Sequence, residues 1–156
     1  MFREMRLAGN MTTQEEAEEM LNTASNGVLA VSGDDGYPYA VPVSFAYEKG
    51  KIYFHSTSSA SHKLDAIRKE QKVSFCVVTQ DKIIPEAFNT LYRSTVVFGK
   101  ARILTDPMEI RNGIMAILKK YAKDHLDSGQ NYMDAESGNF TVIEINIEHM
   151  TGKTGT

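Results

Sequence analysis

The sequence is poor in cysteine, proline and tryptophan, and it has no long apolar run. It contains one cysteine, Cys76, four prolines and no tryptophan. A lone cysteine cannot form a disulfide within the chain, which favours a reducing compartment. No segment approaches the roughly 20 apolar residues of a membrane-spanning helix, and the first residues lack the apolar core of a secretion signal. We therefore expect a cytoplasmic protein with no membrane partner.

The charge balance argues against nucleic acid as the main partner. Lys and Arg number 17 against 20 Asp and Glu, which gives a net charge of -3 over 156 residues. Proteins held mainly by phosphate backbones are normally basic. Hydrophobic residues make up 42% and charged residues 24%, the proportions of an ordinary globular protein. With no internal repeat and no linker, we expect one domain over residues 1–156.

Three segments carry helical signals. Thr12-Thr13 precedes Glu15-Glu16 at the spacing of a capping box, and apolar residues then recur at helical intervals. We expect Asn26-Gly27 to end this first helix with a left-handed cap. The spacing of apolar residues predicts a second helix over residues 59–70, and Asp106-Pro107 is typical of the start of a third.

Six segments predict strands, mostly joined by short antiparallel connections. Residues 48–50 have the length and the glycine of a hairpin turn between the second and third of them. Pro42 cannot donate to a ladder and predicts an edge or bulged strand, and Gly99 predicts a bend or bulge. The six segments are Gly27–Ser32, Tyr39–Tyr47, Lys51–Ser56, Lys72–Thr79, Leu91–Leu104 and Asn139–Ile147.

The remaining segments predict loops. Residues 80–90 have mixed character, residues 124–137 are polar and predict a mobile loop, and residues 151–156 have no apolar side chain to anchor them. Six antiparallel strands with three helices fit a β-barrel with peripheral helices better than a doubly wound parallel sheet. The expected fold class is therefore mainly β.

The densest polar segment spans residues 55–63, where a predicted strand ends and a helix begins. Its nine residues include five hydroxyl side chains, and it ends at Lys63. Unpaired N–H groups at a helix start favour an anion such as a phosphate monoester. The alternative is ordinary capping of the helix by Ser59 or Ser61, with the other hydroxyls solvated.

The other reactive residue types form no known catalytic or metal-binding pattern. His55 and His62 are seven residues apart and belong to no recognised ligand motif, so we expect no metal site. Cys76 lies in an apolar strand, which favours a small buried side chain over a nucleophile. The first hairpin is rich in Tyr and Phe, which either pack in the core or line a pocket for a flat aromatic ligand.

Four short segments occur in a distinctive order: AVPVSF at 40–45, IYFHS at 52–56, HKLDAIR at 62–68 and VSFCV at 73–77. Together they resemble the pyridoxamine 5′-phosphate oxidase-like flavin-binding split barrels, and most closely the NimA branch, named for 5-nitroimidazole resistance. YRSTVVFGKA at 92–101 and MTGK at 150–153 resemble the later long strand and the C-terminal end of that branch. The resemblance runs from about Thr12 to Lys153.

The resemblance implies a homodimer that binds FMN at the interface of two copies, each a six-stranded antiparallel split β-barrel. It implies that one strand backbone approaches the flavin ring, that a strand end contacts the cofactor and that a helix start faces the phosphate. His62 stands where many members carry Arg, which removes a permanently charged, bidentate phosphate contact. The expected FMN-binding residues are Val41, Pro42, Val43, His55, Ser56, Ser61, His62, Lys63, Arg93 and Ser94.

The resemblance also frames the expected function. It implies an FMN-dependent oxidoreductase that reduces a small acceptor such as a nitroaromatic, with NAD(P)H as a candidate electron donor. His55 is the candidate catalytic residue, for proton donation or substrate orientation. Two alternatives stay open: a non-catalytic flavin- or heme-binding module, and a pyridoxamine 5′-phosphate oxidase. The chain lacks the Arg- and His-bearing C-terminal segment of authentic oxidases, which disfavours the latter.

Overall fold

The computed structural model describes residues 1–57, 60–136 and 139–155. Ser59, the alternative helix cap, and Ser137 and Thr156, the ends of two predicted loops, lie outside these residues. The strands are β1 (Gly27–Ser32), β2 (Pro38–Val43), β3 (Ala46–Glu48), β4 (Lys51–Ser56), β5 (Lys72–Ile84), β6 (Asn89–Ile103) and β7 (Thr141–Gly155). The α-helices are α1 (Gln14–Thr23), α2 (His62–Lys69), α3 (Pro107–Tyr121) and α4 (Leu126–Ala135). Short 3₁₀ turns lie at Ala8–Asn10, Asp34–Gly36, Pro85–Ala87 and Lys123–His125.

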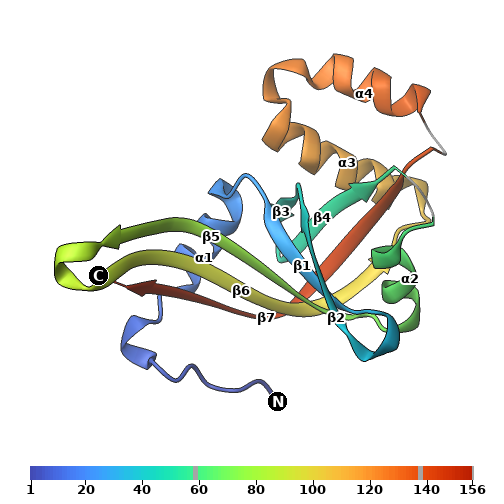
Figure 1. Ribbon diagram of the computed structural model, residues 1–156. Helices are drawn as coiled ribbons and strands as arrows, with labels where there is room; N and C mark the ends of the chain where they lie inside the picture. The colour runs from blue at the N-terminus through green and yellow to red at the C-terminus, as the bar shows by residue number, and fades with distance from the viewer. Residues whose placement is uncertain (58–59, 137–138, 156) are drawn as a thin grey trace.

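The strands form one antiparallel sheet in the order β2-β1-β5-β6-β7-β4-β3 (Figure 1). The mainly β prediction is confirmed, but the described residues contain seven strands rather than six, and the sheet does not close into a ring. The extra strand arises because the predicted strand over residues 39–47 divides in two. The Phe45 backbone N–H donates to the Tyr121 hydroxyl at 2.9 Å, and the Phe45 side chain is fully buried. The chain therefore leaves the ladder there, and β2 and β3 become opposite edges of the sheet.

The positions of β2 and β3 at the two edges of the sheet show which predictions for residues 39–56 are correct. Pro42 lies in edge strand β2, opposite Val28, as its missing N–H required. Of the two halves of the predicted strand, β3 pairs with β4 and β2 pairs with β1, so the predicted hairpin over residues 39–56 is confirmed for its inner part alone. Gly99 lies at an irregularity in the β6–β7 ladder, which confirms the predicted bulge. A side chain there would collide with the Asn146 carbonyl oxygen.

Two predicted loops are in fact paired backbone. Residues 80–84 and 89–90 continue β5 and β6, which together form a long hairpin that projects beyond the body of the sheet (Figure 1). The predicted free tail is the end of β7, where Thr154 pairs with Arg93. The sequence did not predict either extension, because their side chains are mostly polar. The hydrogen bonds of a ladder join backbone groups, so a strand can continue without apolar residues.

The predicted starts of the first and third helices are confirmed. Thr13 accepts from the Glu16 backbone N–H at 3.2 Å, and Asp106 accepts from that of Glu109 at 3.0 Å. The predicted left-handed cap at Asn26-Gly27 is wrong, because α1 ends at Thr23, Ala24 after it is extended, and Gly27 starts β1. Gly27 instead leaves space for the ring of Phe75.

Residues 124–137 were expected to form a loop, and most of the described part is helical instead. The α4 helix lies against α3, and Gly129 allows the close approach, since an added Cβ would come within 2.7 Å of Leu118 Cδ2. Glycine is a poor helix former, so propensity alone disfavours this helix. Packing against α3 outweighs that preference.

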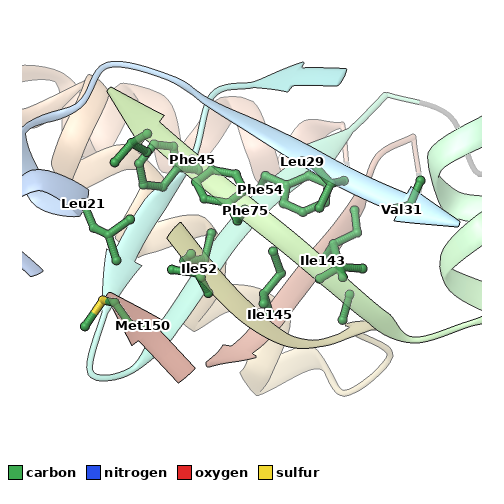
Figure 2. Packing of buried hydrophobic residues seen from close by; sticks show 14 of the residues in the cluster. Leu21, Leu29, Val31, Phe45, Ile52, Phe54, Phe75, Ile143, Ile145 and Met150 are labelled. Carbon is green, nitrogen blue, oxygen red and sulfur yellow. The ribbon is translucent and has the colours of Figure 1, made fainter. Parts of the chain in front are cut away.

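The core lies where α1 and α2 pack on the sheet. Figure 2 shows ten labelled members drawn from α1, from four of the strands and from the β2–β3 connection. A second, smaller cluster lies beneath α3 and includes Tyr53, Ile114, Ile117 and Val142. Burial of this apolar surface is the main stabilising term. Among the described residues, no helix is long and apolar enough to cross a membrane.

Candidate functional site

The predicted anion site lies at the corner between β4 and α2. The end of β4 pairs with the start of β7, with His55 opposite Val142 and Ser56 opposite Thr141. Because side chains alternate along a strand, Ser56 is buried while His55 is exposed on the other face. The strand therefore presents His55 to solvent at the point where the chain turns toward α2.

Ser61 caps α2. Its Oγ accepts from the Leu64 backbone N–H at 3.3 Å, which confirms the capping interpretation for this residue. The first N–H groups of the helix, those of His62 and Lys63, lie too early to have partners inside it. The helix start thus retains the donors and the positive dipole end that favour an anion.

His62 faces the start of β2. Its ring stacks on that of Tyr39, with centroids 4.1 Å apart and an angle of 18° between planes. Its Nε2 accepts from the Asp34 backbone N–H at 3.3 Å and lies 3.7 Å from the Asp34 carboxylate. These contacts join α2 to the 3₁₀ turn before β2. No local pattern could have revealed them, because the partners lie more than 20 positions away.

His55 and Lys63 form the accessible part of the corner. His55 is accessible, but partial burial of its ring and the nearby positive charge of Lys63 both lower its pKa, so this histidine is neutral at pH 7. Within the described part of the chain, Lys63 forms no ion pair. The corner therefore combines a neutral imidazole with an ammonium group that has no carboxylate partner.

The other predicted residues lie on two different strands. Val41, Pro42 and Val43 follow Tyr39 along β2, so the Tyr39–His62 contact joins their strand to the corner. Arg93 and Ser94 lie on β6 opposite the last residues of β7. Figure 1 shows the C-terminal end of β7 and helix α2 at opposite ends of the molecule. One chain brings β2 and α2 together but leaves Arg93 and Ser94 apart from them.

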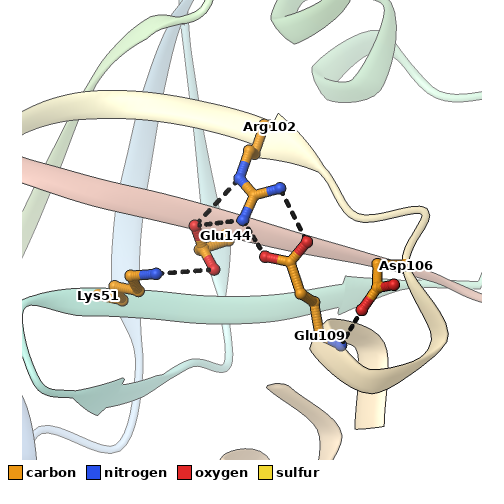
Figure 3. A network of polar contacts seen from close by, with 5 residues as sticks. All are labelled: Lys51, Arg102, Asp106, Glu109 and Glu144. Carbon is orange, nitrogen blue, oxygen red and sulfur yellow. Dashed lines mark hydrogen bonds and ion pairs between the residues drawn. The ribbon is translucent and has the colours of Figure 1, made fainter. Parts of the chain in front are cut away.

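A second polar cluster was not foreseen from the sequence. Glu144 is 3% exposed, and its carboxylate contacts Arg102 at 3.1 Å and Lys51 at 3.5 Å (Figure 3). Arg102 also binds Glu109, which holds the pKa of that carboxyl below its usual value. Burial and the charge of Glu144 raise the pKa of Tyr53 to about 12. Every charge in this cluster has a partner, so it clamps α3 to the sheet rather than offering a ligand site.

Two further titratable groups lie away from the corner. Burial lowers the pKa of Lys120 to about 8, and its Nζ, without a hydrogen-bond partner in the described structure, lies 3.7 Å from the centroid of the Phe45 ring. Cys76, which was expected to be a small buried side chain, is half-buried. Burial raises the pKa of its thiol, which keeps it protonated and weakly nucleophilic.

Comparison with known proteins identifies the family of the chain. The model of the pyridoxamine 5′-phosphate oxidase family matches residues 13–154, which confirms the family predicted from the sequence. None of the curated proteins compared with this sequence matches it.

Several solved structures share the fold. A candidate 5-nitroimidazole antibiotic resistance protein of Bacteroides thetaiotaomicron is 22% identical, covers 92% of this chain and 86% of its own, and has a TM-score of 0.75. A conserved hypothetical protein of Mycobacterium tuberculosis is 19% identical, with coverages of 97% and 90% and a TM-score of 0.81. A FAD-binding protein of Mesorhizobium loti is 23% identical, with coverages of 94% and 97% and a TM-score of 0.65.

Proposed function

Because the chain belongs to the pyridoxamine 5′-phosphate oxidase family, we propose that it is a cytoplasmic, FMN-dependent oxidoreductase of the NimA-like type. Its substrate is a small organic acceptor such as a nitroaromatic, with NAD(P)H as the electron donor. The bound flavin would supply the electron transfer, and the protein would supply binding, orientation and exclusion of water. Flavin-binding and nitroimidazole-resistance proteins among the similar structures support this choice.

The observation that carries the proposal is the uncompensated charge at the start of α2. Lys63 has no carboxylate partner among the described residues, and the first N–H groups of the helix lie beside it. A phosphate monoester carries two negative charges and accepts several hydrogen bonds, so it matches this set of donors. Ser61 uses its oxygen lone pair to cap the helix, which leaves its hydroxyl hydrogen for a ligand.

His62 has a different task in this proposal. Its ring is stacked on Tyr39, and its Nε2 accepts a hydrogen bond from Asp34. We therefore assign it to fixing the first turn of α2 against β2, with Lys63 as the side chain that pairs with the phosphate. The absence of the family arginine then leaves one permanent cation at this site rather than two.

The proposed flavin site needs two copies of the chain. Arg93 and Ser94 lie on β6 beside the end of β7, while α2 lies at the far end of the molecule. A homodimer in which β6 of one copy faces the corner of the other would bring both sets to one flavin. The edge-strand residues Val41, Pro42 and Val43 would then border the ring through their backbone.

His55 is the side chain that we assign to the substrate. Its lowered pKa keeps it neutral, so one ring nitrogen bears a proton and can donate a hydrogen bond. A nitro or carbonyl oxygen accepts such a bond, which would orient the acceptor over the flavin. Burial and the adjacent Lys63 disfavour a charged imidazolium, so this role is orientation more than acid catalysis.

Flavin titration tests the phosphate assignment. We expect the purified protein to bind FMN, and Lys63→Ala to weaken that binding by about 1–3 kcal/mol, the cost of a lost charge-assisted hydrogen bond. Lys69→Ala, at the other end of the same helix, is the matched control and should bind FMN normally. Equal affinity of the two variants would remove Lys63 from the site.

Turnover tests the oxidoreductase assignment. The FMN-loaded protein should be bleached anaerobically by NAD(P)H and reoxidised by a nitroaromatic acceptor, and His55→Ala should slow the second step. A flavin that binds but is never reduced and reoxidised would indicate a binding module instead. Formation of pyridoxal phosphate would indicate the alternative oxidase.

A further inference from the structure

A groove of about 400 Å³ lies between α3 and α4, and none of the residues assigned above to the flavin or its substrate lines it. One face of each helix lines it, together with Phe140, which directly precedes β7. Its walls are mainly apolar, with Met108, Ile110 and Met133 beside Phe140. Volume and composition are those of a small-molecule site. Thioether and aromatic walls favour a flat ring as the occupant.

Three polar side chains also line the groove. The Oε1 of Gln130 is buried and has no hydrogen-bond partner in the described structure. Its Nε2 donates to the Asp134 carboxylate at 3.1 Å, which leaves the other Asp134 oxygen as an acceptor. Arg111 is exposed and forms no ion pair within the described ranges. A buried acceptor without a donor is costly, so a ligand N–H at Gln130 would recover free energy.

The groove begins close to the corner between β4 and α2. Phe140 directly precedes Thr141, which pairs with Ser56, and the Leu104 N–H donates to the carbonyl of Val142, the residue opposite His55. Leu104 in turn lies just before Asp106, the cap of α3. Phe140 and Pro107, which both line the groove, thus lie within three residues of backbone that pairs with the end of β4 or with the strand beside it.

We propose that this groove binds an adenylate group, that is, adenine with its ribose and phosphate. The base lies against the methionine and phenylalanine side chains, and its exocyclic amino group donates to Gln130 Oε1. A ribose hydroxyl donates to Asp134, and Arg111 pairs with the phosphate. The inference deepens the proposed function and rests on it for the identity of the larger molecule, either the adenylate half of FAD or that of a nicotinamide dinucleotide.

Titration with AMP tests the groove independently of any flavin. The intact protein should bind AMP, and Arg111→Leu and Gln130→Leu should each weaken binding at least tenfold. Gln130→Leu removes an unsatisfied buried oxygen, so its melting temperature should equal or exceed that of the parent and loss of binding cannot be ascribed to unfolding. Lys123→Leu, a neighbouring surface cation that does not line the groove, is the control and should bind AMP normally.

FMN, FAD and NADH identify the carrier of the adenylate. If FAD carries it, FAD should bind at least tenfold more tightly than FMN, and Arg111→Leu should abolish that difference. If the nicotinamide dinucleotide carries it, the two flavins should bind equally and Arg111→Leu should weaken NADH alone. Failure of AMP to bind, or equal binding by all variants, would overturn the groove assignment. Failure of FMN and FAD with AMP binding intact would overturn the flavin proposal instead.

Discussion

At the base of α3, Glu144 is almost completely buried and its carboxylate contacts both Arg102 and Lys51. At the start of α2, Lys63 is half-buried and no carboxylate of the described chain pairs with it. Both regions join a strand to a helix, and both are rich in charge. The first is internally neutralised, as a structural clamp must be when charge is buried. The second leaves positive charge uncompensated, which is the property that a site for an anion requires.

The largest expected effect is loss of the clamp. Arg102→Met leaves the buried Glu144 carboxylate with Lys51 as its remaining cation, and we expect a loss of about 2–4 kcal/mol in the free energy of unfolding. Urea denaturation measures it, with the exposed Arg6→Met as control. The double variant Arg102→Met/Glu144→Met should regain most of the loss, because neither charge is then buried alone. A single variant as stable as the parent would contradict the clamp.

Lys120 provides a third case to compare with the clamp and the corner. Its ammonium group packs against the aromatic rings of Phe45 and Tyr121, whereas the cations of the clamp contact carboxylates. Burial lowers the pKa of Lys120 from 10.5 to about 8 in the folded chain. Between pH 8 and pH 10.5 the folded state therefore binds fewer protons than the unfolded state, so the free energy of unfolding rises with pH in this range. We expect Lys120→Met to stabilise the fold at pH 7 by about 1–2 kcal/mol, since the Phe45 ring already offsets part of the burial cost.

The stabilising effect of Lys120→Met should shrink as the pH approaches 10, where the folded parent no longer buries a charged lysine. Chemical denaturation at pH 7 and pH 10 measures both values, with Lys119→Met, an exposed neighbour, as the control. An effect independent of pH would show that lost packing, not charge, is being measured.

The smallest effect concerns the interaction within the corner itself. Lys63 lowers the pKa of His55, so Lys63→Met should raise that pKa, as followed by the His55 ring protons in an NMR titration. Because the folded pKa lies below the value of an unfolded histidine, His55 lowers stability as the pH falls through that range, and the variant should lose less stability in acid. An unchanged titration would show that the two side chains do not interact.

The sequence revealed those features that depend on neighbours along the chain. The caps at Thr13 and Asp106, the edge position of Pro42 and the bulge at Gly99 each follow from the chemistry of one or two residues. The β4–α2 corner was likewise visible as a hydroxyl-rich segment. Its hydroxyls predict a cap at Ser59 or Ser61, and the structure shows a cap at Ser61.

The features that the sequence concealed depend on partners far away in the chain. The Phe45 N–H leaves the ladder for Tyr121, 76 positions later, and this contact divides one predicted strand into two. Helix α4 forms although its glycine disfavours it, because that glycine meets Leu118. His62 was expected to face a phosphate, and its stacking on Tyr39 has no local signal.

The place of β7 has a consequence for the order in which the molecule is made. This strand is last along the chain, yet it lies between β6 and β4 in the sheet. Until residues 141–155 have left the ribosome, the β3–β4 hairpin has no strand to join it to the other four. Before that point, the nascent chain exposes the apolar faces of two partial sheets, which a chaperone could bind. The complete sheet therefore forms only after β7 has been synthesised.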